Sequence, residues 1–257
     1  MREAIRALIP AELQPPTDLP RRVLAGIGYF RVRTWLAAHG QAIPDAALYQ
    51  PLYSPWLGEP EFEALYGAVR GRTLVSRDRC YVLWRTLRQA ARLPGQVIEC
   101  GVYRGGTALL AARTLAGAGS EHELHLFDSF AGMPETTPDV DRFRPGDLAG
   151  ASAKEVAELL VPYPLVRLHV GTIPETFSGL AQGRVVWAHV DVDLYRSVRD
   201  CVEFLLPRLV PGGIMVFDDY GFPSCAGARR AVDEAFATRP EVPLCLPTGQ
   251  CLVVKLP

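Results

Sequence analysis

The sequence predicts an α/β fold built on a doubly wound, mostly parallel sheet of seven strands. Short β-branched or apolar runs alternate with helical stretches between residues 97 and 236, and strands separated by helices imply right-handed crossovers into a parallel sheet. The last two apolar segments are joined by Pro-Thr-Gly-Gln, so they are expected to close the sheet as an antiparallel hairpin. An apolar fraction of 49% in 257 residues is enough for a single folded core.

The first 75 residues differ from the rest of the chain. Prolines divide them into short pieces, so they are predicted to form a helical extension in front of a sheet domain of residues 76–257. Aromatic residues are dense between residues 49 and 66, and rings at this density must be buried against something. Two interpretations stay open: the segment packs on the core, or it is a lid over a binding site.

Helix and strand signals then follow one another in order. Ser76, with Asp78 in the first turn, is predicted to cap a helix that ends before Pro94. Strands are expected at residues 97–102, 124–128, 165–170, 185–191 and 213–218, and the hairpin at residues 243–246 and 251–255. Helices are expected at about 107–116, after the capping box Ser152-x-x-Glu155, at about 197–206 and at about 227–236. The loop over residues 131–150, rich in Pro and Asp, is predicted to be mobile.

Composition argues against several classes of partner. The net charge is −1 and no cluster of Lys and Arg is interleaved with aromatic residues, so neither a nucleic acid nor an anionic membrane is an expected partner. No apolar run is long enough to span a bilayer and no apolar signal segment follows the N-terminus, so a cytoplasmic location is expected. The six cysteines include no C-x-x-C pair and are expected to be reduced thiols.

The first candidate site lies between Val97 and Thr107, where a strand runs into glycines and then a helix. Gly101, Gly105 and Gly106 let the backbone approach a ligand, and the helix start at Thr107 presents unpaired N–H groups. A tight turn without a ligand explains the same glycines, and their spacing is not that of G-x-G-x-x-G.

Acidic residues follow the first two strands. Glu99 ends the first strand and Asp128 ends the second, and both are expected to contact a cofactor. A carboxylate after the second strand can accept both hydroxyls of an adenosine ribose, a role shared by NAD and S-adenosylmethionine sites. A helix cap or a solvated acid is the alternative, but the neighbouring glycine loop favours a ligand. The antiparallel hairpin favours S-adenosylmethionine, because a dinucleotide-binding domain normally continues with a parallel strand.

Four carboxylates follow two strands that are expected to be neighbours: Asp191, Asp193, Asp218 and Asp219. Strand alternation places Asp191 and Asp193 on the same side. Like charges at one strand edge are unfavourable unless protons or a cation neutralise them, and an all-oxygen set suits a hard cation such as Mg²⁺. Acids that cap helices and face water are the alternative.

Five segments, taken in order between about Ser76 and Phe236, resemble those of the macrocin O-methyltransferase family. They are Ile-Glu-Cys-Gly-Val-Tyr-Arg-Gly-Gly-Thr at 98–107, Leu-Phe-Asp-Ser-Phe at 126–130, Gly-Thr-Ile-Pro-Glu-Thr-Phe at 171–177, His-Val-Asp-Val-Asp-Leu-Tyr at 189–195 and Pro-Gly-Gly-Ile-Met-Val-Phe-Asp-Asp-Tyr-Gly at 211–221. The resemblance implies a class I, Rossmann-like methyltransferase fold, with S-adenosylmethionine and Mg²⁺ as cofactors. It also implies a glycosylated small molecule as the acceptor, because members of the family methylate deoxysugar hydroxyls of antibiotics.

The resemblance also assigns roles to residues. The family's metal ligands fall on Asp191, Asp218 and Asp219, and its proposed general base falls on Asp193. Asp191 is further implied in cofactor binding, and the same motifs add these cofactor-binding residues: Tyr103, Ser129, Phe130, Gly171 and Thr172.

Alternatives stay open at this point. His189 and His169 are rival bases, although both lie within strand runs where a hydrogen-bonded structural histidine is expected. A metal-dependent glycosyltransferase that holds a nucleotide sugar through Asp191-Val-Asp193 is the second function considered. A homo-oligomer is expected, in which the aromatic extension packs on a second subunit.

Overall fold

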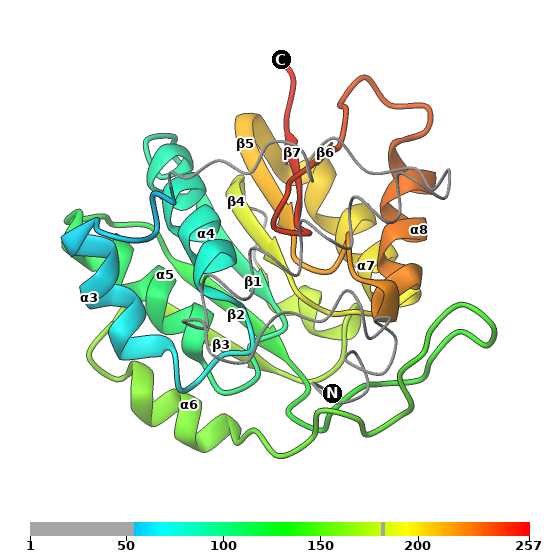
Figure 1. The fold of residues 1–257 in the computed structure, drawn as a ribbon, viewed down its shortest axis with the longest axis horizontal. Coiled ribbons are helices and arrows are strands. Elements are labelled where there is room, and N and C mark those ends of the chain that lie inside the picture. Colours follow the sequence, from blue (N-terminus) through cyan, green and yellow to red (C-terminus); the bar gives the residue numbers. More distant parts are fainter. Residues whose placement is uncertain (1–53, 181–182) are drawn as a thin grey trace, which may run out of the picture. The chain divides into compact units, whose positions relative to one another are not determined.

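The computed structural model describes residues 54–180 and 183–257. Pro55–Pro257 form one compact unit. This unit begins before the predicted boundary between residues 75 and 76, because helix α3 (Pro60–Val69) contributes Phe62 and Val69 to its core. Figure 1 shows its central sheet with helices on both faces.

The seven strands of the sheet lie in the order β3-β2-β1-β4-β5-β7-β6. The strands are β1 (Gln96–Cys100), β2 (Leu124–Asp128), β3 (Val166–Val170), β4 (Val185–Val190), β5 (Leu209–Phe217), β6 (Leu244–Cys245) and β7 (Cys251–Val254). The pairings among β1 to β5 are parallel, whereas β7 is antiparallel to both β5 and β6. The predicted mostly parallel sheet with a closing hairpin is confirmed. Cys245 and Cys251 face each other in this hairpin as free thiols.

The order of the strands determines where a ligand can bind. From β1 the chain proceeds outward through β2 and β3, and it then returns to the other side of β1 with β4 and β5. The carboxyl ends of β1 and β4 therefore meet where the winding direction changes. Ligands of open α/β sheets bind at such a switch point.

Six α-helices are described, together with short 3₁₀ turns at Glu175–Gly179, Leu206–Arg208 and Pro223–Cys225. The other helices are α4 (Arg77–Ala90), α5 (Gly106–Gly117), α6 (Ala153–Leu160), α7 (Tyr195–Leu205) and α8 (Ala226–Phe236). Ser152 caps α6 as predicted, its hydroxyl accepting a hydrogen bond from the Glu155 N–H. Ser76 occupies the predicted N-cap position of α4. Its hydroxyl, however, donates to Asp78 and does not accept a hydrogen bond from the helix backbone. Among the described residues, no helix is long and apolar enough to cross a membrane.

Helices cover the two faces of the sheet in separate groups (Figure 1). α3, α4, α5 and α6 pack on one face, and α7 and α8 pack on the other. In α7 the buried Val198, Cys201, Val202 and Leu205 recur on one helical face. Burial of each large apolar side chain contributes roughly 1.5–3 kcal/mol, so this stripe fixes α7, and the residues that precede it, against the sheet.

The aromatic segment over residues 49–66 is described only from residue 54 onward. Phe62 is fully buried, with its ring centroid 5.1 Å from that of Tyr81 and 5.5 Å from that of Trp84 on α4. The described part is therefore packed on the core. Tyr49 and Tyr53 lie outside the described residues.

Candidate active site

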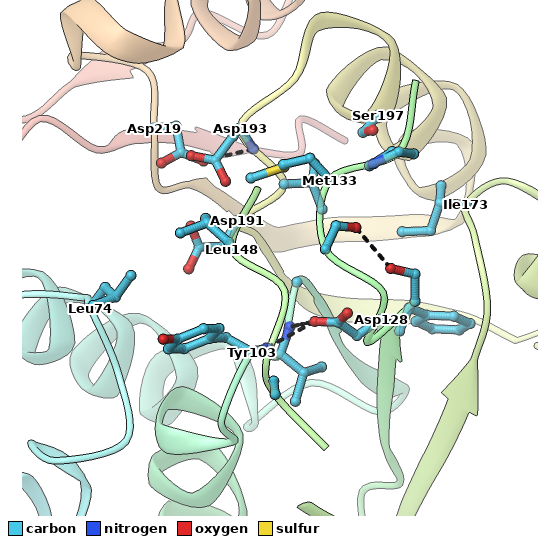
Figure 2. A pocket seen from close by; sticks show the side chains of 18 of the residues that line it. Leu74, Tyr103, Asp128, Met133, Leu148, Ile173, Asp191, Asp193, Ser197 and Asp219 are labelled. Atoms are coloured by element: carbon cyan, nitrogen blue, oxygen red, sulfur yellow. Dashed lines mark hydrogen bonds between the residues drawn. The ribbon is translucent and has the colours of Figure 1, made fainter. Parts of the chain in front are cut away.

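A cavity of about 260 Å³ lies at the carboxyl ends of β1, β2, β4 and β5. Its lining includes these predicted site residues: Gly101, Tyr103, Thr107, Asp128, Ser129, Phe130, Gly171, Thr172, Asp191, Asp193 and Asp219. Four predicted residues do not line it: Glu99, Gly105, Gly106 and Asp218. Figure 2 shows Asp128 and Tyr103 at one side of the pocket, and Asp191, Asp193 and Asp219 at the other.

Gly101 lets the ends of β1 and β4 meet backbone to backbone. Its φ is +89°, and a Cβ at this position would lie 1.8 Å from the carbonyl oxygen of Asp191. The Asp191 N–H in turn donates to the Cys100 carbonyl over 2.8 Å. Only glycine fits here, which brings Asp191 to the edge of the glycine loop.

Gly105 and Gly106 act through the backbone and not through the cavity. Gly105 adopts a left-handed conformation at the start of α5, and a Cβ on Gly106 would lie 2.7 Å from that of Thr73. The glycines were predicted to give a ligand access. The geometry assigns Gly106 to packing of α5 against the segment that precedes α4, and Gly105 to the contact with Val156 and Leu159 of α6.

Asp128 organises the loop that follows β1. Its Oδ2 accepts hydrogen bonds from the N–H groups of Val102 at 2.7 Å and Tyr103 at 2.8 Å, and its Oδ1 accepts from Phe130 N–H at 2.7 Å. Tyr103 and Phe130 both have positive φ, which costs free energy in a residue with a side chain. A carboxylate has about four acceptor positions. Backbone N–H groups of the protein use three of these positions, so one acceptor position remains for a ligand. The prediction from the sequence was that Asp128 accepts from two ribose hydroxyls.

Glu99 lies beneath the cavity, paired with His189 on the neighbouring strand. The Glu99 Oε1 and His189 Nδ1 atoms are 3.1 Å apart, and both side chains are almost completely buried. The predicted contact between Glu99 and a cofactor is therefore replaced by a contact with His189. The second Glu99 oxygen, Oε2, is buried without a hydrogen-bond partner among the described residues.

His189 bridges two carboxylates, as expected of a structural histidine. Its Nε2 atom is 3.4 Å from the Asp218 Oδ1 atom. Burial alone would lower the pKa of His189, but its interactions with Asp218 and Glu99 raise that pKa well above the usual value. His169 is likewise engaged, since its Nε2 lies 3.0 Å from His125 Nδ1. Neither histidine lines the cavity.

Asp218 is neutralised by other protein groups. The Arg79 guanidinium contacts its Oδ2, and the Gln250 amide donates to its Oδ1 over 2.7 Å. Burial opposes ionisation, but the interactions with His189 and Arg79 prevail and hold the pKa of Asp218 below its usual value. Arg79 and Gln250 were missed from the sequence, because they come from a distant helix and from the residue before β7.

Asp191, Asp193 and Asp219 face the cavity. Burial raises the pKa of Asp191 and Asp219 well above the usual range, and the charge of neighbouring aspartates raises both further. A divalent cation would relieve this repulsion, so the carboxylates fit such an ion. Potential ligand atoms form two groups within 4.8 Å, one of His189, Asp191 and Asp218 and one of Asp193, Asp219 and Cys225. The predicted trio of Asp191, Asp218 and Asp219 is thus divided between them.

Asp193 occupies a constrained turn directly before α7. Its φ is +56°, and the N–H of Leu194 donates to the Val192 carbonyl around it, which is a strained γ-turn. The Asp193 N–H donates to Asp219 Oδ2 over 3.1 Å, and the Cys225 thiol donates to Asp193 Oδ1 over 3.3 Å. Burial raises the pKa of Asp193 above its usual value, which makes the carboxylate a better proton acceptor.

Apolar side chains missed from the sequence complete the cavity. They come from the segment before α4 and from two loops after strands: Leu74, Met133, Leu148 and Ile173. Figure 2 shows Leu148 and Met133 close to the aspartates. Loop residues show no hydrophobic periodicity that would identify them as part of a cavity wall. The sequence therefore indicated only the motifs at the strand ends as site residues.

Comparisons with known proteins agree on the family. The model described as Macrocin-O-methyltransferase (TylF) matches residues 68–238. The chain is 36% identical over 148 residues to 8-demethyl-8-(2,3-dimethoxy-alpha-L-rhamnosyl)-tetracenomycin-C 4'-O-methyltransferase of Streptomyces olivaceus, covering 53% of this chain and 57% of that protein. It is 29% identical over 178 residues to Mycinamicin III 3''-O-methyltransferase of Micromonospora griseorubida, covering 63% of this chain and 69% of that protein. The chain thus spans little more than half the length of the first relative.

Solved structures share the fold. The O-methyltransferase NovP matches with a TM-score of 0.63 and 25% identity, over 72% of this chain and 83% of that one. The calicheamicin methyltransferase CalS11 matches with a TM-score of 0.61 and 21% identity, over 93% of this chain and 95% of that one, and this likeness concerns the fold alone. The predicted class I methyltransferase fold is confirmed. Because the family model covers most of the chain, the protein belongs to the macrocin O-methyltransferase family.

Proposed function

We propose that this protein transfers a methyl group from S-adenosylmethionine to a hydroxyl on the sugar of a small, antibiotic-type natural product. The relatives from Streptomyces olivaceus and Micromonospora griseorubida carry names of O-methyltransferases that act on such glycosylated compounds. The observation that carries the proposal is one cavity with two unlike halves: the Asp128 loop on one side and three aspartates on the other.

The Asp128 half suits the methyl donor. Asp128 keeps one free acceptor position for a ribose hydroxyl, and Gly101 leaves room for a ligand beside the backbone. Further residues proposed to line the cofactor are Tyr103, Thr107, Ser129, Phe130, Gly171 and Thr172. The donor supplies a methyl group on a sulfonium, and positioning it in line with the acceptor oxygen is the main work of this half.

The aspartate half suits a divalent cation, which we propose to be Mg²⁺. Asp191 and Asp219 would hold it from the cavity side, and Asp218 would join them once Arg79 withdraws. When bound, the ion lowers the pKa of a hydroxyl in its vicinity.

Asp193 is the proposed base. Its carboxylate is held between Asp219 and Cys225 at the same end of the cavity. The acceptor oxygen forms its bond to the methyl carbon as the carbon–sulfur bond breaks, and the hydroxyl proton passes to Asp193. His189 is not a rival, because it is buried between Glu99 and Asp218.

The glycosyltransferase alternative loses its support. It rested on Asp191-Val-Asp193 holding a metal against a nucleotide sugar, whereas the family that matches the chain is one of methyltransferases. A homo-oligomeric, cytoplasmic enzyme stays a prediction from the sequence.

The proposal is tested by methyl transfer from S-adenosylmethionine with a deuterated methyl group. A panel of deoxysugar-bearing natural products and their matched aglycones is incubated with the protein and read by mass spectrometry. We expect a label on the sugar oxygen of a glycoside and none on its aglycone. Treatment with EDTA should abolish transfer and Mg²⁺ should restore it. Transfer that is undiminished after exhaustive EDTA treatment would remove the metal from the mechanism.

A further inference from the structure

The loop between β2 and α6 forms one wall of the cavity. Gly132, Met133 and Leu148 of this loop line it. The base of the loop closes on itself, since Met133 N–H donates to the Asp147 carbonyl over 2.8 Å and Gly146 N–H donates to the Met133 carbonyl over 2.9 Å. The residues between, 134–145, form a tip that must be held by other contacts.

Asp141 connects this tip to the start of α7. Its Oδ1 accepts a hydrogen bond over 2.9 Å from the N–H of Tyr195, the first residue of the helix. Leu194 at the N-cap position supplies no side-chain acceptor of its own. Asp141 therefore provides, from 54 residues away, the carboxylate that a helix N-terminus favours. Its Oδ2 accepts from the Thr137 N–H over 2.7 Å, which fixes the carboxylate within the loop.

The first turn of α8 is shaped to admit Asp141. A Cβ on Gly227 would lie 2.1 Å from the Asp141 Oδ1 atom, so any larger residue there would displace the carboxylate. Phe143, two residues further along the loop, packs against the apolar layer between the sheet, α7 and α8. Figure 1 shows this loop, drawn in green, running toward the start of α8. One polar and one apolar contact thus anchor the tip.

We propose that Asp141 is a positioning residue that joins the wall of the cavity to the turn carrying Asp193. α7 begins two residues after Asp193, and the strained turn around Asp193 can persist only if the helix start is fixed. Asp141 fixes that start and, through the same carboxylate, holds the loop of Met133 and Leu148 against the cavity. The assignment of Asp193 as the base rests on the proposed function; the mechanical link between loop and helix does not.

The link is tested by the accessibility of Cys225, a buried thiol that lines the cavity beside Asp193. Alkylation by N-ethylmaleimide is followed by peptide mass spectrometry, with the exposed Cys245 as internal reference. In Asp141→Ala and in Gly227→Ala the rate at Cys225 should rise about five- to tenfold, in line with loss of a helix-capping acceptor. Asp141→Asn keeps an acceptor oxygen and should restore most of the protection. Asp139→Asn, which removes a charge from an exposed position of the same loop, is the matched control and should change nothing.

Hydrogen exchange supplies the second readout. Peptides covering residues 133–147 and 193–199 should exchange faster in Asp141→Ala, while those of β1 and β4 stay protected. An unchanged Cys225 rate in both Asp141→Ala and Gly227→Ala would overturn the proposal, and so would equal acceleration at Cys225 and Cys245, which indicates general loosening. Calorimetric binding of S-adenosylhomocysteine to the wild-type protein tests the proposed function separately, because neither thiol reactivity nor exchange depends on methyl transfer.

Discussion

Arg79 on α4 contacts the carboxylate of Asp218, which the resemblance to the family assigned to a metal. The pair is largely buried, and the Arg79 guanidinium also lies 4.8 Å from the ring centroid of Phe222 at the cavity. A guanidinium therefore occupies the Oδ2 atom of Asp218, one of its two potential ligand atoms. Removing one partner of a buried ion pair leaves an uncompensated charge, so under the proposed function Arg79 and the metal would compete for this carboxylate.

Replacing Arg79 by methionine should therefore strengthen the response to Mg²⁺. Asp218 loses its guanidinium partner in this variant, so the metal-free protein should be less stable and the rise in melting temperature on adding Mg²⁺ should exceed that of the wild type. Arg85→Met is the control, since Arg85 lies on the same helix and pairs with Glu59 instead. Thermal unfolding with and without Mg²⁺ is the measurement. A smaller Mg²⁺ effect than in the wild type would mean that Arg79 supports the ion and does not compete with it.

Asp193→Asn should lower turnover by about 10²–10⁴ while S-adenosylmethionine and Mg²⁺ still bind. Asparagine keeps the shape of the side chain but cannot take up the proton of the acceptor hydroxyl. Raising the pH should restore part of the rate if deprotonation limits it. Asp200→Asn on α7, where Asp200 pairs with Arg199, serves as the control and should retain full turnover. An Asp193→Asn enzyme as fast as wild type would place the base elsewhere.

Asp128→Ala should weaken both cofactor binding and the fold. The carboxylate accepts three backbone hydrogen bonds, so its removal affects the loop after β1 as well as the cofactor. Loss of these acceptors should reduce the free energy of unfolding by at least about 2 kcal/mol. Asp128→Asn retains one acceptor oxygen and should fall between the two proteins. Chemical denaturation measures the effect on the fold, and calorimetry with S-adenosylmethionine measures the effect on cofactor binding. An Asp128→Ala protein as stable as wild type would show that the loop after β1 does not depend on the Asp128 carboxylate.

The His125–His169 pair should make stability fall on acidification. Burial lowers the pKa of His125 and His169, and the charge of His169 lowers that of His125 further. Just below the ordinary histidine pKa of 6.5, the unfolded chain therefore binds protons more readily than the native protein. Stability that is present above this pH is lost as the pH falls. His125→Gln should flatten the decline in melting temperature between about pH 7.5 and 5.5. An equally steep decline in this variant would assign the acid sensitivity to other groups.

Much of the sheet was predictable from the sequence because its signals are local. The apolar runs before Gly101, Ser129 and Asp191 mark strands that stop where polar residues or glycine begin, and the structure places these ends around one cavity. The spacing between Ser152 and Glu155 likewise predicts the start of α6. In each case the residues that decide the structure are close together in the chain.

The divided aspartates were not predictable, because their partners come from remote segments. Asp218 is neutralised by Arg79 from α4 and by Gln250 from the hairpin, contacts that no sequence spacing encodes. Glu99 was assigned to a ligand since it ends a strand, but its side chain meets His189 on the next strand, which only the register of the sheet determines. The contact between Asp141 and the Tyr195 N–H also joins remote segments and could not be read from the sequence, and the mobility expected of this loop stays a prediction.

The cavity should bind S-adenosylmethionine as the methyl donor, and calorimetry tests this binding without knowledge of the acceptor. S-adenosylmethionine, NAD and UDP-glucose are titrated in parallel into the same Mg²⁺-containing protein. We expect saturable one-site binding of S-adenosylmethionine, weakened in Asp128→Asn, and no binding of the other two ligands. Binding of NAD or UDP-glucose by a protein that gives no heat with S-adenosylmethionine would contradict it.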